Sequence, residues 1–238
     1  MCLENITKWA TTNYLKLNED KSKFMIVSNS SATTDILQFN DVDFKLEKVV
    51  KNLGFLIDRT LNFNAQINQV CRKGFNLLRN LWKISSKLNN IDLKTRLITS
   101  CLFPHIDYCN SLYACLPNKY IHKLQRLMNA AVRFIFNFRR FERISISEHL
   151  KKLHFLPVKY RVDFKVCSLV YKIMIGAAPE YLANLIRPKT SLPSLRVYND
   201  QFLLEVPKPE KENYKNRCFS LYAPKLWNSL PKEIRSAC

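Results

Sequence analysis

The chain has 238 residues, of which 47% are hydrophobic, and its 38 lysines and arginines against 19 acids give a formal net charge of +19. This apolar content suffices for a core, and the length fits one large domain or two small ones. No run of eighteen apolar residues occurs, so we expect no transmembrane helix. We also expect no membrane partner. The N-terminus lacks a basic region followed by an apolar one, so we expect an intracellular protein that is not secreted, in the nucleus or the cytoplasm.

The excess of cations predicts a polyanionic partner. A folded surface this basic attracts polyanions, and the phosphate backbone of RNA or DNA is the commonest of them. A charge-rich surface with no dedicated ligand is the alternative. Net charge carries no information on sequence specificity.

Residues 1–60 predict one short helix and several short strands separated by Ser, Asn and Asp turns. The expected strands are 24–27, 36–39, 44–50 and 55–57. Gly54 lies between the last two. It indicates either a bulge with close backbone approach or an ordinary turn.

From residue 63 to about 141, apolar residues recur at steps of three and four, which predicts helices. We expect one helix over about 67–84 and a second over about 93–102, interrupted or capped at Pro104. A third helix is expected over 118–140. Its apolar stripe consists of Ile121, Leu124, Met128, Ala131, Ile135 and Phe138.

The third helix also has a cationic stripe. Its members are Lys119, Lys123, Arg126, Arg133 and Arg140, at spacings of 4, 3, 7 and 7. At about 100° per residue the two stripes lie nearly opposite each other, over about 33 Å. Because five cations without an acid repel one another, stability alone does not favour this stripe, and it predicts phosphate contacts; a solvated face is the alternative. Nearby Phe134, Phe136 and Phe141 are candidates for base stacking or, as aromatics at helical spacing usually are, for the core.

After about residue 156 a further helix is expected, with Pro157 in its first turn and the Ala-Ala-Pro at 177–179 ending it. Its apolar side contains Val162, Val166, Leu169, Val170 and Ile173, and its other side contains Arg161, Lys165 and Lys172. From Arg187 the chain is proline-rich and polar, which predicts extended structure. Residues 219–231 predict a short docked helix held by Leu226, Trp227 and Leu230.

The eight cysteines contain no Cys-x-x-Cys pair and lie mostly in apolar helical patterns, so we expect buried thiols. A zinc site from His105, Cys109, Cys115 and His122 is the alternative, but its spacing matches no finger template. The four histidines have no neighbouring nucleophile motif, and the chain has no Gly-rich phosphate loop.

Eight sequence blocks, taken in order, resemble a known family over nearly the whole chain. The blocks are LKLNEDKSKFMIV at 15–27, KNLGFLID at 51–58, LFPHIDYCNSLY at 102–113, KLQRLMNAAVRFI at 123–135, LHFLPV at 153–158, RVDFKVCSLVYKIM at 161–174, APEYLANLI at 178–186 and FSLYAPKLWNSLP at 219–231. They resemble the region downstream of the catalytic motifs in a LINE-type (non-LTR), jockey-like retrotransposon reverse transcriptase, an RNA-directed DNA polymerase of a transposable element.

The resemblance implies an α+β, mostly α fold in three parts. A short β-rich palm remnant covers 1–60, a helical thumb covers 61–155, and a connector with a Pro-rich C-terminal extension covers 156–238. Lys21 and Lys23 fall on motif D, where we expect solvated surface lysines. Leu53, Gly54 and Phe55 fall near the primer grip. The thumb location favours nucleic-acid contact by the cationic stripe, and we add Arg161 and Lys165 as candidates.

Polymerases of this family hold two Mg²⁺ ions on aspartates of motif A and of a Tyr/Phe-Ala-Asp-Asp hairpin. The chain has no Asp-Asp dipeptide, and its nine aspartates are scattered. We therefore expect a truncated fragment without polymerase activity, with no cofactor, since Mg²⁺ belongs to the full-length family enzyme. At most it binds RNA or DNA backbones without sequence preference. The alternative is an interaction module that docks a partner protein or the missing front half of a polymerase.

Overall fold

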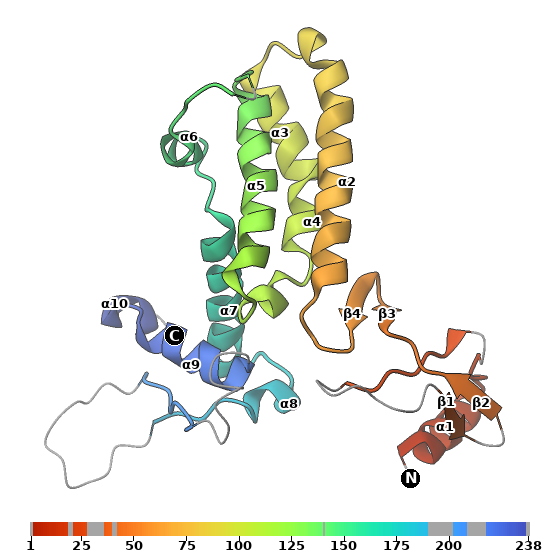
Figure 1. Ribbon diagram of the computed structural model, residues 1–238. Helices are drawn as coiled ribbons and strands as arrows, with labels where there is room; N and C mark the ends of the chain where they lie inside the picture. Colours follow the sequence, from red (N-terminus) through yellow and green to blue (C-terminus); the bar gives the residue numbers. More distant parts are fainter. Residues whose placement is uncertain are drawn as a thin grey trace, which may run out of the picture. The chain divides into compact units, whose positions relative to one another are not determined.

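The computed structural model describes residues 2–18, 21–27, 36–39, 42–139, 141–189, 202–208 and 218–236. The chain is mostly helical with two small two-stranded sheets, which confirms the predicted class (Figure 1). It divides into two compact units, Met1–Gln66 and Ile67–Cys238. Across the described part of the chain, no helix combines the length and the apolar character that a membrane span requires.

The first unit contains one helix and two β-hairpins. Its elements are α1 (Cys2–Thr12), β1 (Ile36–Phe39), β2 (Val42–Lys45), β3 (Val49–Asn52) and β4 (Phe55–Asp58). β1 pairs with β2, and β3 pairs with β4, both antiparallel. The second hairpin has Val49 opposite Asp58 and Asn52 opposite Phe55.

Two of the predicted strands are wrong. Residues 24–27 form only an isolated bridge from Phe24 to Leu46, and the expected strand 44–50 breaks into β2 and β3. The break arises because the Glu47 backbone N–H donates to the Phe24 carbonyl at 2.9 Å, so this stretch leaves one hairpin before entering the next.

Gly54 occupies an ordinary hairpin turn. Leu53 and Gly54 are the two loop residues, and both have positive φ, 47° and 89°. Two consecutive positive φ values match the right-handed twist of the flanking strands, and glycine adopts them without steric cost. A Cβ built on Gly54 would meet nothing within 4 Å, so the alternative of a close backbone approach is wrong.

The second unit is helical. Its elements are α2 (Asn64–Lys83, which starts at the end of the first unit), η2 (Ser85–Lys87), α3 (Ile91–Cys101), α4 (Phe103–Asp107), η3 (Asn110–Tyr113), α5 (Asn118–Ile135), α6 (Ile146–Lys152), α7 (Val158–Met174), α8 (Glu180–Ala183), α9 (Phe219–Asn228) and α10 (Lys232–Arg235). Figure 1 shows α2, α3 and α5 lying side by side, with α2 and α5 running in the same direction.

Helix α5 lies at the centre of this unit. Its buried residues are Tyr120, Leu124, Leu127, Met128, Ala131, Val132, Phe134 and Ile135. This set contains four of the six residues in the predicted apolar stripe and is wider than that stripe. The extra width arises because α5 packs against α3, α6 and α7 as well as α2.

Helix α5 ends at Ile135, so the predicted extension to residue 140 is wrong. Asn137 has a φ of 59°, its N–H donates to the Phe134 carbonyl, and the Phe138 N–H donates to the Arg133 carbonyl at 2.9 Å. These bonds form a Schellman motif, in which a left-handed residue ends the helix and satisfies its last carbonyls. Asparagine tolerates this conformation, which a search for glycine misses.

Helix α7 joins the predicted thumb and connector into one unit. The Val158 N–H donates to Gln125 Oε1 of α5 at 2.9 Å. Near its other end α7 packs in a second core cluster, whose buried members are Val166, Val170, Ile186, Leu204, Ala223 and Trp227. Gly176, with φ of 71°, ends α7 before the Ala-Ala-Pro expected to do so, because its left-handed conformation closes another Schellman motif.

The cysteines are less buried than expected. Cys71, Cys115, Cys167 and Cys218 are half-buried, and burial raises the pKa of Cys115 and of Cys167 to about 11. Cys101 and Cys109 are exposed, so the prediction of buried thiols is wrong for these two. Cys101 is the last residue of α3, and Cys109 lies between α4 and η3, so both are at element ends, where helical periodicity does not report burial.

Candidate nucleic-acid interface

Helices α2 and α5 carry only positive charge. Neither sequence contains an aspartate or a glutamate, and each contains four cations. The eight are Arg72, Lys73, Arg79, Lys83, Lys119, Lys123, Arg126 and Arg133. Because neither helix contains an acidic residue, no negative charge within them cancels the positive potential of these cations.

Three contacts establish how these two helices pack. Lys123 Nζ of α5 donates to Asn68 Oδ1 of α2 at 2.9 Å. Further along, a Cβ on Gly74 would lie 2.5 Å from a Leu127 methyl group, and the Trp82 ring meets the Phe134 ring edge-on at 5.5 Å. Residues later in α2 contact residues later in α5, so the two helices are parallel. We call the line along which they meet at the surface the seam.

The half-buried Cys71 lies on this seam. Burial raises the pKa of its thiol, while the charges of Lys123 and Arg126 act in the opposite direction. These two cations therefore lie near Cys71, and Lys123 also contacts Asn68 of α2. We define the α2–α5 face as Arg72, Phe75, Arg79 and Trp82 of α2 with Lys119, Lys123 and Arg126 of α5.

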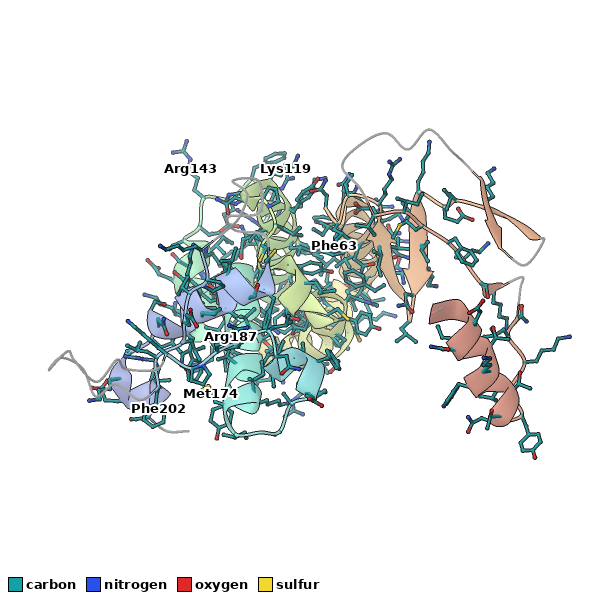
Figure 2. All side chains as sticks on the ribbon, turned by 90° about the horizontal axis from the view of Figure 1, so that it is seen from below. Phe63, Lys119, Arg143, Met174, Arg187 and Phe202 are labelled. Carbon is teal, nitrogen blue, oxygen red and sulfur yellow. The ribbon has the colours of Figure 1, made fainter. Side chains whose placement is uncertain are left out.

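Lys119 and Arg126 are exposed, and Lys123 is half-buried. Figure 2 shows Lys119 at the edge of the helical unit. The ammonium groups of Lys119 and Lys123 lie 5.0 and 5.8 Å from the centroid of the Tyr120 ring. Cation–π contact with the ring supports both side chains, and Lys119 stays exposed. Three of the five predicted stripe residues thus come together with cations of α2.

Arg133 has a different environment from the rest of the predicted stripe. Its guanidinium donates to the carbonyls of Arg139 at 2.7 Å and Glu142 at 3.0 Å, which holds the loop after α5 against the helix end. Arg140 lies outside the described residues. Arg143, on the same loop, points away from the body of the unit (Figure 2).

The structure places Arg161 in an ion pair. Its guanidinium binds both carboxylate oxygens of Asp107 and lies 4.2 Å from the centroid of the Phe103 ring. A two-point pair of this kind fixes α7 against α4, so we exclude Arg161 from the interface. Lys165 is exposed on α7 and is not part of the α2–α5 face.

The three aromatic residues predicted as candidates for base stacking have different environments. Phe134 is fully buried, and Phe136 stacks with Phe138 beside His149. Phe141 is 88% exposed. The sequence reasoning missed Phe75 and Trp82 of α2, which are 42% and 39% exposed. Their signal was available: both lie outside the stripe of Ile67, Val70, Leu78 and Leu81, and they are seven residues apart.

The remaining candidates belong to the first unit. Lys21 and Lys23 are exposed, and Lys23 Nζ lies 3.5 Å from a carboxylate oxygen of Glu47. Leu53 is exposed in the hairpin turn, whereas the adjacent Phe55 is buried. The alternation of an exposed turn residue and a buried strand residue is that of an ordinary β-hairpin.

No metal-binding group occurs among the described residues: nowhere in them do three His, Cys, Asp or Glu side chains gather in suitable positions. His105, Cys109, Cys115 and His122 are all described and do not form the four-ligand zinc site that the sequence left as an alternative.

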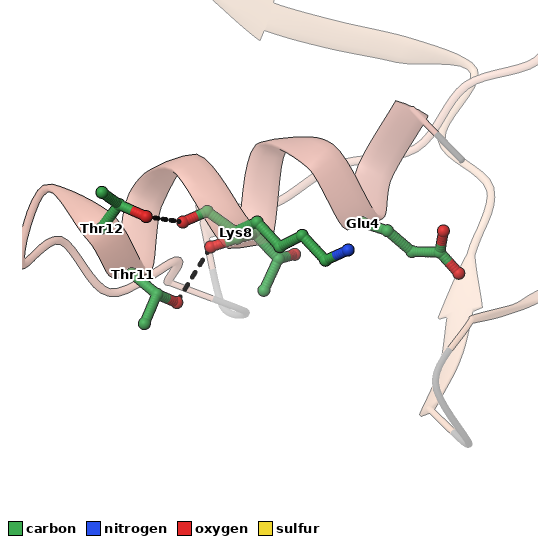
Figure 3. Close-up of a pocket in the computed structure, with 5 residues that line it drawn as sticks. Glu4, Lys8, Thr11 and Thr12 are labelled. Atoms are coloured by element: carbon green, nitrogen blue, oxygen red, sulfur yellow. Dashed lines mark hydrogen bonds between the residues drawn. The ribbon is translucent and has the colours of Figure 1, made fainter.

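A surface hollow of about 540 Å³ lies on α1, lined by Glu4, Thr7, Lys8, Thr11 and Thr12 (Figure 3). All five belong to one helix, so groups from different elements do not converge there. The Thr11 and Thr12 hydroxyls each donate at 2.9 Å to the carbonyl four residues earlier, which commits those protons to the helix itself. The hollow has no built ligand site.

A buried cation lies beneath the α5 terminus. Lys94 of α3 is 1% exposed, its Nζ donates to Asn137 Oδ1, and it lies 5.2 Å from the Phe134 ring centroid. Burial lowers the pKa of Lys94 below its ordinary value of 10.5. The unfolded chain therefore holds more protons than the folded chain between the lowered pKa and 10.5, and stability rises with pH over that interval.

Replacing Lys94 by methionine is expected to remove this rise in stability. Urea denaturation of the native protein and of Lys94→Met, repeated from neutral pH to about 10.5, measures it. The exposed Lys87→Met is the matched control and retains the native pH dependence. The interpretation fails if the Lys94 and Lys87 variants show the same curve.

The chain matches no protein-family model, no curated protein and no solved structure.

Proposed function

We propose that this chain binds RNA and DNA through their sugar–phosphate backbone, without sequence preference, on the α2–α5 face. We further propose that it corresponds to the thumb and connector of a non-LTR retrotransposon reverse transcriptase and has no polymerase activity of its own. The observation that carries the binding proposal is the pair of parallel helices with eight cations and no acid.

The charge arrangement suits a phosphate backbone. Cations in each row repeat at seven residues, Arg72 to Arg79 on one helix and Lys119 to Arg126 on the other. Seven residues rise about 10.5 Å, so the two charges of each such pair are about 10.5 Å apart along the helix. Contacts to phosphate position a protein on nucleic acid without reading its sequence.

The proposed origin rests on the eight sequence blocks and on the mostly helical fold. Family polymerases bring aspartates together around two Mg²⁺ ions, but this chain has no Asp-Asp dipeptide, and its described residues form no metal-binding group. The described residues of this chain therefore do not fit the two Mg²⁺ ions of the family polymerases. We therefore assign the chain a binding role and no step of nucleotide transfer.

Binding of an RNA–DNA hybrid across a salt series, with primer extension assayed in the same tubes, tests the proposal. If Arg72, Arg79, Lys119, Lys123 and Arg126 each neutralise a phosphate, the logarithm of affinity falls against that of salt with a slope of about −4 to −5. We expect no primer extension.

The variant Lys119→Glu/Arg126→Glu is expected to weaken binding by about tenfold or more at low salt and to make the slope about 2 units shallower. The control Lys159→Glu/Lys172→Glu makes the same change in net charge on the exposed side of α7 and leaves most of the affinity intact. Equal losses in both pairs would show that net charge, and not this face, is responsible. Primer extension by the chain would overturn the proposed lack of activity.

The interaction-module alternative has one observation in its favour. The outer side of α7 exposes Tyr160, Phe164, Tyr171 and Ile175, which are 4, 7 and 4 residues apart and lie on one side of the helix. An apolar helix side of this kind can pack on a protein partner. Absence of nucleic-acid binding at low salt, with a defined complex in sedimentation, would favour this function.

A further inference from the structure

We infer that the nucleic acid on the α2–α5 face is single-stranded and that its unpaired bases stack on Phe75 and Trp82. This inference deepens the proposed function and depends on it. It concerns the class of ligand, because the proposed phosphate contacts by themselves accept duplex and single strand alike.

Phe75 and Trp82 are unusual residues on α2. The buried side of this helix consists of Gln66, Ile67, Val70, Gly74, Leu78 and Leu81. At 100° per residue, Phe75 and Trp82 point about 90° to 110° away from the centre of that side, toward the seam with α5. Each keeps about two-fifths of its surface exposed, 42% and 39%.

Each ring has an arginine three residues before it on the helix surface. Arg72 precedes Phe75, and Arg79 precedes Trp82, so the same cation–aromatic pair occurs twice, seven residues apart. Residues at i and i+3 are neighbours on a helix surface. The two rings are therefore about 10.5 Å apart along α2, each next to its own cation.

The cations of α5 lie at one end of the aromatic row, because Lys123 contacts Asn68, which precedes Phe75 on α2. Cys71, one turn before Phe75, lies close enough to Lys123 and Arg126 for their charges to act on its thiol. The Trp82 ring contacts Phe134 of α5 edge-on and keeps 39% of its surface exposed. The three cations of α5 thus lie before Phe75 along α2, and Arg72 and Arg79 lie beside the two rings.

This order of groups suits a single strand. In a duplex the base faces are covered by neighbouring pairs, so a protein ring can reach only edges and backbone, whereas unpaired bases stack on aromatic side chains. A strand along α2 can place phosphates on the cations of α5 and on Arg72 and Arg79, and can place bases on the two rings. An acidic protein segment would use the cations but would gain no stacking from the rings.

Intrinsic fluorescence tests the stacking directly. Trp9 is 61% exposed and Trp227 is 2% exposed, so Trp82 is the main accessible tryptophan once Trp9 is replaced. In the Trp9→Phe chain, we expect oligo(dT) to quench the emission on binding. A duplex of the same length should bind with little quenching.

The variant Phe75→Leu keeps an apolar side chain and removes the ring. It is expected to weaken oligo(dT) binding by about tenfold while duplex binding stays within about twofold. Phe164→Leu, at the exposed ring on α7, is the matched control and leaves both affinities unchanged.

The possible failures are distinguishable. Equal affinity for oligo(dT) and duplex, with no effect of Phe75→Leu, overturns the single-strand inference and leaves the proposed function in place. No binding of either probe at low salt overturns both. Polyglutamate that displaces oligo(dT) and quenches Trp82 equally well also overturns the inference and indicates an acidic protein ligand.

Discussion

Replacing Trp227 by alanine is expected to lower the free energy of unfolding by about 3–5 kcal/mol. Trp227 is 2% exposed and packs in the cluster that joins α7 to α9. Its indole Nε1 donates to the Phe202 carbonyl at 2.9 Å, so truncation leaves a cavity and removes a hydrogen bond.

The loss should extend beyond the side chain. The neighbouring Asn228 exchanges two hydrogen bonds with the Leu204 backbone, at 2.8 and 2.9 Å, and Leu204 is itself buried in the same cluster. Residues 202–208 therefore depend on α9 for their position. Without the indole ring, the backbone of this segment loses one of three hydrogen bonds to α9.

Urea denaturation followed by circular dichroism measures the effect of Trp227→Ala. Limited proteolysis should cleave the variant earlier between α8 and α9. Trp9→Ala is the matched control, because Trp9 is 61% exposed, and its expected change is within about 0.5 kcal/mol. Similar losses for the two variants would contradict the assignment of Trp227 to the core.

Replacing Gly74 by valine is expected to lower the free energy of unfolding by about 1–3 kcal/mol. A Cβ at this position would lie 2.5 Å from one Leu127 methyl carbon and 2.9 Å from a Leu102 methyl carbon. Both leucines are fully buried, so they have little room to move. The added side chain must push α2 away from α5.

The exposed Asn76→Val on the same helix is the control for Gly74→Val. It introduces the same β-branched residue where nothing is displaced, and its effect is limited to helix propensity, a few tenths of a kcal/mol. Denaturation of both variants compares packing with propensity. A Gly74→Val chain as stable as the control would show that the helices do not approach closely. Separation of the helices should also weaken oligo(dT) binding, since the face spans both.

Periodicity predicted the helical part of this fold well, because the spacing of apolar residues records which side of a helix is buried. Leu124, Met128, Ala131 and Ile135 of α5 are buried as expected. The strands were less predictable. Two hairpins of four-residue strands have little periodicity to read, and a single bond from Glu47 to Phe24 decides where one of them ends.

Individual site residues were harder to predict than elements. Arg133 and Arg161 have the same charge as Lys119 and Arg126, yet the first bonds to backbone carbonyls and the second pairs with Asp107. These partners are separated from them by 6 to 54 residues. A charge pattern along one helix contains no information on contacts of that kind.

The sequence by itself determined the strong positive charge, the mostly helical class and the two opposite sides of α5. These follow from composition and from local spacing, which act within one or two turns of chain. Only the tertiary structure decided that α2 lies parallel to α5, that Gly74 permits their approach, and that the cations of α5 lie on the same face as Phe75 and Trp82. Such juxtapositions depend on packing between segments about fifty residues apart, and many different pairings satisfy the same local pattern.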